Sequence, residues 1–168
     1  MPIKKKTAKP FGLVPKIDES AQQAKAFYDE IAIDTLARTL WGEARGEGSA
    51  GMQAVAHIVL NRLAISKKMG RYWWGNDVVQ ICQKPFQFSC WNKDDPNRGK
   101  LITLNADNDI YFVTARRIAR RAITGALGSD ITMGATHYHA KGIVPYWSKD
   151  QSPVTQLGAH IFYRLINI

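Results

Sequence analysis

Two glutamates in a glycine-rich segment are the residues of this sequence best suited to proton transfer. Glu43 and Glu47 stand in Gly42-Glu43-Ala44-Arg45-Gly46-Glu47-Gly48, directly after Trp41. A carboxyl group that apolar neighbours partly remove from water serves as a general acid near neutral pH. For Glu47 a structural role competes, because an acid in the first turn of a following helix is stabilised by the helix dipole. At Glu43 the dipole of the preceding helix would disfavour an acid, so chemistry is the better explanation there.

A second candidate cluster is His137-Tyr138-His139. In a strand the two histidines lie on one face and Tyr138 on the other. They would bind a metal ion only with a third ligand, from Glu43 or His160. No Cys pair or His-Glu-x-x-His element accompanies them, and a hydrogen-bonded histidine pair is the commoner arrangement. We therefore expect no metal and no other cofactor.

Helices are expected on both sides of the glutamates. Apolar residues at helical spacing predict one helix from Ile33 to the glycines after Trp41, and a second from an N-cap at Ser49 to Leu63. A third helix over 111–126 carries alanines on one face and arginines on the other.

The C-terminal part of the chain changes character. Period-two alternation predicts two antiparallel strands, Ile131 to His139 and His160 to Ile166, joined by the loop Pro145 to Gly158. Residues 65–108 are expected to be irregular and, at that length, functional. The fold class is therefore α+β, mainly helical with a small antiparallel β element near the C-terminus. We expect one domain over 27–168, preceded by a basic arm over 1–26.

Charge limits the partners. The 168 residues carry 23 Lys and Arg against 14 Asp and Glu, a net charge of +9, which favours nucleic acid, anionic lipid or an acidic envelope polymer. No apolar run approaches the roughly 18 residues of a membrane span, so no stable membrane insertion is expected. The lysine-rich N-terminus lacks the apolar stretch of a secretory signal, which predicts that the chain stays in the cytoplasm or leaves by another route.

The two cysteines, Cys82 and Cys90, match no zinc-binding spacing. A disulfide between them would form only in an oxidising compartment. Reduced, partly buried thiols are the favoured interpretation, because a free Cys commonly behaves as a small core residue.

The motifs together resemble the cell-wall hydrolases of the SleB/CwlJ type. The resemblance rests on LARTLWGEARGE (36–47) and GMQAVAHIVLNR (51–62), followed in the same order by CQKPFQFSCW (82–91), GATHYH (134–139) and LGAHIFY (157–163). It implies a reduced lysozyme-like domain that cleaves the glycan strands of peptidoglycan, with Glu43 as the catalytic acid and a monomeric chain. It further implies substrate-binding residues, which are Glu47, Gln87, Phe88, Ser89, Trp91, Tyr138, His139, Trp147 and His160.

The implied reaction is that of a lytic transglycosylase. In it, the acid protonates the glycosidic oxygen and the muramyl 6-hydroxyl closes onto C1, which leaves a 1,6-anhydro end; one carboxyl group suffices, unlike the usual two of a glycosidase. Spore members of the family usually carry a secretion signal and a wall-binding domain. A basic chain without either is typical of a phage endolysin or a phage-derived enzyme, held in the host cytoplasm until release to the periplasm or cell wall.

Three alternatives stay open at this point. Water could attack C1 at the same site, which would make the enzyme a muramidase. A metal-dependent amidase could use His137, His139 and His160 to cut the peptide stem. A basic module could bind envelope polymers or nucleic acid without turnover, with binding that weakens steeply in salt; with the family resemblance, peptidoglycan is the expected partner and nucleic acid is not.

Overall fold

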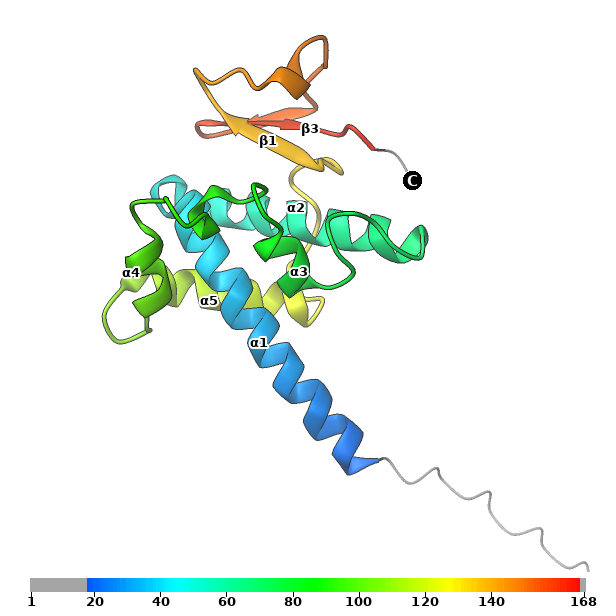
Figure 1. Ribbon diagram of the computed structural model, residues 1–168, viewed down its shortest axis with the longest axis vertical. Coiled ribbons are helices and arrows are strands. Elements are labelled where there is room, and N and C mark those ends of the chain that lie inside the picture. The colour runs from blue at the N-terminus through cyan, green and yellow to red at the C-terminus, as the bar shows by residue number, and fades with distance from the viewer. Residues whose placement is uncertain (1–17, 167–168) are drawn as a thin grey trace, which may run out of the picture.

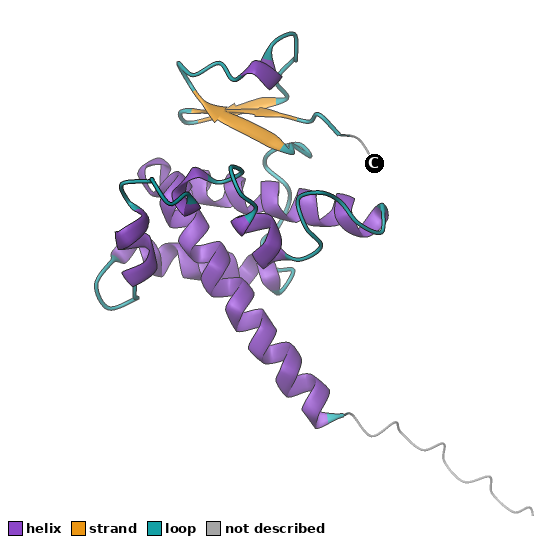
Figure 2. Cartoon of the chain, in the orientation of Figure 1, coloured by secondary structure: helices purple, strands orange, loops and turns teal. Residues whose placement is uncertain are grey.

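A computed structural model describes residues 18–166 as a helical layer that carries a small sheet on one side (Figures 1 and 2). The helices are α1 (Glu19–Ala44), α2 (Gly48–Lys68), α3 (Val78–Gln83), α4 (Arg98–Thr103) and α5 (Ile110–Ile123). The strands are β1 (His137–Ala140), β2 (Thr155–Leu157) and β3 (His160–Tyr163), which form an antiparallel sheet in the order β1-β3-β2. The expected α+β class, mainly helical with a small C-terminal sheet, is confirmed.

The core lies where α1 packs against α2 and α5. Leu40 and Trp41 on α1 and Ile58 on α2 are fully buried, and Phe112 on α5 is almost so. Asp109 caps α5, because its Oδ1 accepts from the backbone N–H of Phe112 at 3.0 Å and from Nε1 of Trp41 at 3.1 Å. One carboxylate thus starts a helix and fixes it to the end of α1 that carries Glu43.

The helix boundaries differ from those predicted by spacing. α1 begins at Glu19, after Asp18, whose Oδ1 accepts from the backbone N–H of Ser20 at 3.1 Å. Its first ten residues bury no apolar face, and Phe27 is 65% exposed. The sequence therefore shows no helical spacing of apolar residues there. Residues 19–26 of the expected arm are therefore helical, and residues 1–17 lie outside the described residues.

The prediction of Ser49 as an N-cap is wrong. α2 already begins at Gly48, where the chain leaves the short 3₁₀ turn Arg45–Glu47 with a φ of 69°, and no side chain caps the helix. Glycine adopts this left-handed conformation without steric cost, so the chain turns from the 3₁₀ turn into α2 at Gly48 without a capping side chain.

Residues 65–108 are less irregular than expected, because α3 and α4 lie within them. Each helix has only six residues, too few for a periodic pattern. The expected loop from Pro145 to Gly158 contains β2, which pairs with β3. The first half of the strand expected from Ile131 is a turn. Within residues 18–166, no helix combines the length and apolar character that a membrane crossing requires.

Candidate active site

Glu43 lies in the last turn of α1, half-buried, where the helical layer meets the sheet. Its Oε1 accepts from the backbone N–H of Cys90 at 3.1 Å, and its Oε2 accepts from the hydroxyl of Tyr138 on β1 at 2.8 Å. Burial, and then the nearby Glu43 carboxylate, raises the pKa of Tyr138 well above its ordinary value, so its hydroxyl stays protonated and able to donate. Two donors from distant parts of the chain therefore fix the carboxyl group.

Gly42 allows the first of these contacts. A Cβ atom at position 42 would overlap Cβ of Cys90 and lie 2.8 Å from its Sγ. The absence of a side chain lets the 3₁₀ turn η2 (Ser89–Trp91) approach α1 closely enough to place its N–H against Glu43. Both cysteines are free and buried, as expected; burial raises the pKa of Cys82 to about 12 and raises that of Cys90 as well.

Glu43 opens into a cavity of about 590 Å³ between the helices and the sheet. Six of the substrate-binding residues expected from sequence line it with Glu43, namely Gln87, Ser89, Tyr138, His139, Trp147 and His160. The structure adds residues that the sequence did not single out for this cavity, namely Arg62, Phe86, His137, Ala140 and Ile143, and it places Trp73 on the wall. The cavity thus joins one carboxyl group, one buried cation and several aromatic surfaces, a composition suited to a sugar polymer.

Arg62 is the main residue that sequence reasoning missed. It lies on α2 with 4% exposure, and its Nε donates to the backbone oxygen of Thr136 at 2.9 Å, just before β1. Its guanidinium lies over the rings of Trp74 at 5.0 Å and Phe88 at 5.3 Å, while Nη1 has no hydrogen-bond partner within residues 18–166. Burial lowers its pKa to about 10, which leaves it a cation at neutral pH. A signal existed, since Arg62 falls on the buried face of α2.

Three of the expected substrate-binding residues lie elsewhere. Phe88 is 1% exposed and packs in the core, below Arg62, where no substrate reaches it. Trp91 packs against the core and donates from Nε1 to Oγ1 of Thr39 at 3.0 Å. Glu47 lies outside the lining of the cavity. A period-two pattern could not separate Phe88 and Trp91 from Gln87 and Ser89, because the segment that contains all four is not a regular strand.

Glu47 fastens the sheet to the helices. Its Oε2 accepts from the backbone N–H of Ala159, in the turn between β2 and β3, at 2.9 Å. Two glycines make room for its side chain: a Cβ at Gly51 would overlap Cβ of Glu47, and a Cβ at Gly158 would overlap Oε2. We call Glu47, Gly51 and Gly158 the Glu47 cradle.

Replacing Glu47 separates a fastening role from a catalytic one. Glu47→Gln keeps a side-chain oxygen that accepts from Ala159, so we expect activity within about threefold of wild type. Glu47→Ala removes the acceptor, and we expect a loss of about 1 kcal/mol in unfolding free energy and a larger loss of activity as the sheet loosens. Urea unfolding and turnover of purified wall measure both; inactivity of the Gln variant would contradict the fastening role.

The three histidines do not form a metal site. Nδ1 of His139 donates to the backbone oxygen of Ala140 at 2.9 Å, which leaves Nε2 to accept from the hydroxyl of Tyr163 at 3.0 Å. Nδ1 of His137 lies 2.9 Å from Oγ1 of Thr136. Across residues 18–166, no three His, Cys, Asp or Glu side chains gather as ligands.

The half-buried His137 makes stability depend on pH. Burial, with the nearby Arg62 cation, lowers the pKa of His137 to about 4. Below about pH 6.5 the histidine binds a proton in the unfolded chain but stays neutral in the folded protein. The contribution of neutral His137 to the unfolding free energy is therefore fully present above that pH and is lost as the pH falls toward 4. We expect a lower Tm at pH 5 than at pH 7, and a smaller difference in His137→Asn, whose amide oxygen can still meet Thr136. Equal pH dependence in both proteins would contradict this account.

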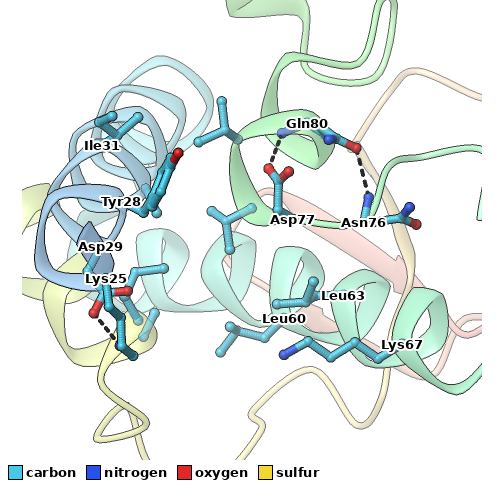
Figure 3. Close-up of a pocket in the computed structure, with 15 residues that line it drawn as sticks. Lys25, Tyr28, Asp29, Ile31, Leu60, Leu63, Lys67, Asn76, Asp77 and Gln80 are labelled. Atoms are coloured by element: carbon cyan, nitrogen blue, oxygen red, sulfur yellow. Dashed lines mark hydrogen bonds and ion pairs between the residues drawn. The ribbon is translucent and has the colours of Figure 1, made fainter. Parts of the chain in front are cut away.

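A larger hollow lies away from Glu43. It measures about 730 Å³ between the first part of α1, α2, α3 and the end of α5. Figure 3 shows Leu60 and Leu63 on its floor, with Lys25 paired to Asp29 at one end and Asp77 bonded to the backbone of Gln80 at the other. Lys25 and Asp29 in its lining pair with each other and Asp77 caps α3, so these carboxylates are engaged in structural contacts and the candidate site stays at Glu43.

Comparisons with known proteins found similar sequences and similar structures. A family model described as Cell Wall Hydrolase matches residues 46–163, a range that begins three residues after Glu43. The spore cortex-lytic enzyme of Halalkalibacterium halodurans is 32% identical over 148 residues, which is 86% of this chain and 38% of that protein. The spore cortex-lytic enzyme of Bacillus subtilis is 28% identical over 149 residues, 88% of this chain and 42% of that protein. The chain thus spans about two fifths of the length of these relatives.

Two solved structures share the fold. The catalytic domain of the Bacillus cereus SleB protein superimposes with a TM-score of 0.58 at 26% identity, over 79% of this chain and 88% of that one. The catalytic domain of the germination-specific lytic transglycosylase SleB from Bacillus anthracis gives a TM-score of 0.57 at 26% identity, over 79% of this chain and 93% of that one. The reduced lysozyme-like domain expected from the sequence motifs is thereby confirmed.

Proposed function

Since the chain belongs to the cell wall hydrolase family, we propose that it cleaves the glycan strand of peptidoglycan as a lytic transglycosylase, with Glu43 as general acid and then general base. The observation that carries this proposal is the position of Glu43, held by two donors on the wall of the cavity between helices and sheet. The solved relative from Bacillus anthracis is described as a lytic transglycosylase, which supports the same reaction here.

In the proposed reaction, protonated Glu43 gives its proton to the glycosidic oxygen as the bond between that oxygen and C1 of the muramyl residue breaks. The 6-hydroxyl of the same muramyl residue then bonds to C1, and its proton passes to the Glu43 carboxylate. The products are a 1,6-anhydro end and a free 4-hydroxyl on the departing sugar, and Glu43 regains its proton. One carboxyl group that both gives and takes a proton completes the cycle without a second acid.

The other lining residues orient the carboxyl group and the sugars. Tyr138 and the N–H of Cys90 hold the two Glu43 oxygens, so the carboxyl group presents a fixed direction to the cavity. Gln87, on the wall, offers an amide to N-acetyl and hydroxyl groups, and Trp147 offers an indole surface. The Arg62 cation next to the cavity stabilises the Glu43 carboxylate that forms when the proton leaves.

A muramidase would use the same Glu43 but would let water reach C1 before the 6-hydroxyl. The two reactions give products that differ by the mass of one water molecule. We therefore propose mass spectrometry of the soluble products that the wild-type protein releases from purified peptidoglycan. Anhydro-muramyl ends support the transglycosylase, reducing muramyl ends would identify a muramidase, and free stem peptides would overturn cleavage of the glycan strand.

A further inference from the structure

A second hollow adjoins the candidate active site. It measures about 470 Å³, and Trp73 lines both this hollow and the cavity of Glu43. Consecutive residues of the chain also line both spaces, because Lys84 and Pro85 line the second hollow and the next residue, Phe86, lines the cavity. A polymer that leaves the cavity past Trp73 therefore enters the second hollow, which we call the Trp73 groove.

Two aromatic side chains stand exposed along this path. Trp73 is 53% exposed and Phe86 is 86% exposed. Phe86 also has a φ of 64°, a left-handed conformation that costs a residue with a large side chain roughly 1–3 kcal/mol. Packing does not account for an exposed aromatic held in a strained backbone, whereas aromatic faces stack well on sugar rings. The junction between the two hollows thus offers two exposed aromatic surfaces on which sugar rings can stack.

The Trp73 groove is cationic. Arg71 and Lys84 line it, and Nζ of Lys84 lies 5.5 Å from the centre of the Trp73 ring. Within residues 18–166, neither side chain has a carboxylate within 4.0 Å, and the lining of the groove holds none. The remaining polar lining includes the amides of Asn76 and Gln83. Two cations beside an aromatic wall match a sugar polymer that carries carboxylates.

We propose that the Trp73 groove binds the carboxylates of the peptide stems of peptidoglycan through Arg71 and Lys84, so that the enzyme prefers strands with free stem acids. This inference rests on the proposed function. In peptidoglycan the acidic groups belong to the stems, and to the muramyl lactyl group once a stem has been removed. The Trp73 groove lies beyond the wall of the cavity, which places the cations beside a stem rather than beside the sugar that reacts.

The test compares three soluble substrates with one glycan length. They are native strands, strands whose stem carboxylates have been converted to carboxamides, and strands stripped of their stems, which keep only the lactyl acid. We expect wild-type kcat/KM to be about 5- to 10-fold higher on native strands than on the other two, as two partly exposed ion pairs would give. The preference should shrink as salt rises, because the contacts are open to solvent.

Two double variants assign the preference to the groove. Arg71→Gln with Lys84→Gln should lower kcat/KM on native strands to the level of the amidated ones and leave activity on amidated strands within about twofold. The matched control, Lys67→Gln with Lys68→Gln, removes the same charge from exposed positions outside both hollows, and it should keep the preference. A wild-type enzyme that treats native and stripped strands alike, or a groove variant that keeps the preference, overturns the inference while the proposed function stands. Absence of shortened glycan products from every substrate would overturn the proposed function itself.

Discussion

Replacing Glu43 by Gln lowers turnover of purified peptidoglycan by about 10³-fold, the size expected when a general acid loses its proton. The amide keeps the shape of the side chain. Its oxygen still accepts from the N–H of Cys90, and its NH₂ can donate to a Tyr138 hydroxyl that rotates to accept. Folding is therefore expected to be unchanged, and the loss falls on the chemical step. Turnover measured from released anhydro ends, with circular dichroism for the fold, checks both expectations.

Glu47→Gln is the matched control, because it makes the same chemical change four residues away on a side chain outside the cavity. We expect a difference of at least about 100-fold between the two Gln variants. A Glu43→Gln protein that retains more than about a tenth of wild-type turnover would remove Glu43 from the catalytic role. A pair of variants that lose activity equally would indicate that both glutamates act mainly on the fold.

Gly42→Ala should damage stability and activity together. The added Cβ would overlap the side chain of Cys90, which is almost completely buried and has no room to move. Overpacking of this kind costs about 1–3 kcal/mol in unfolding free energy. Any relaxation must move Cys90 away from α1, which lengthens the hydrogen bond from its N–H to Glu43. We expect a fall in Tm and at least about a tenfold loss of turnover.

Gly46→Ala provides the control for the loss of a glycine in the same segment. A Cβ at position 46 meets no atom within 4 Å, and the residue is exposed. We expect a Tm equal to that of wild type or slightly higher, since Ala restricts the unfolded chain more than Gly. Equal damage from both substitutions would contradict the close approach of Cys90 as the cause.

The sequence predicted the helices correctly where one face of the helix packs against the core. The helix over 111–126 was predicted almost to its bounds, because alanines on one face and arginines on the other give a strong period. The start of α1 was not predicted, because residues 19–28 have no buried face and only the Asp18 cap marks the boundary. β2 was also missed, since a three-residue strand is too short to show alternation.

The same limit applies to the candidate site. The local surroundings, carboxyl groups at a helix end beside an aromatic residue, pointed to both Glu43 and Glu47. The family resemblance chose Glu43, and the structure places it on the wall of the cavity. Helical spacing could have placed Arg62 on the buried face of α2, but its bond to Thr136 spans 74 residues and no local pattern predicts that contact. Phe88 and Ser89 are neighbours in one turn, yet one is in the core and the other on the cavity wall. Only the three-dimensional path of that turn decides which side chain faces the cavity.

The Glu47 cradle joins Glu47 and Gly51, which are four residues apart, to Gly158 near the other end of the chain, so the residue allowed at one position depends on the others. A Cβ atom at Gly158 would overlap Oε2 of the Glu47 carboxylate, and a Cβ atom at Gly51 would overlap Cβ of Glu47. Alanine at position 158 therefore requires a shorter residue at position 47, which gives up the bond to Ala159, whereas alanine at position 51 would overlap the Cβ of any residue at position 47. Among related chains, positions 47 and 158 should accordingly change together, and position 51 should stay glycine wherever residue 47 carries a side chain.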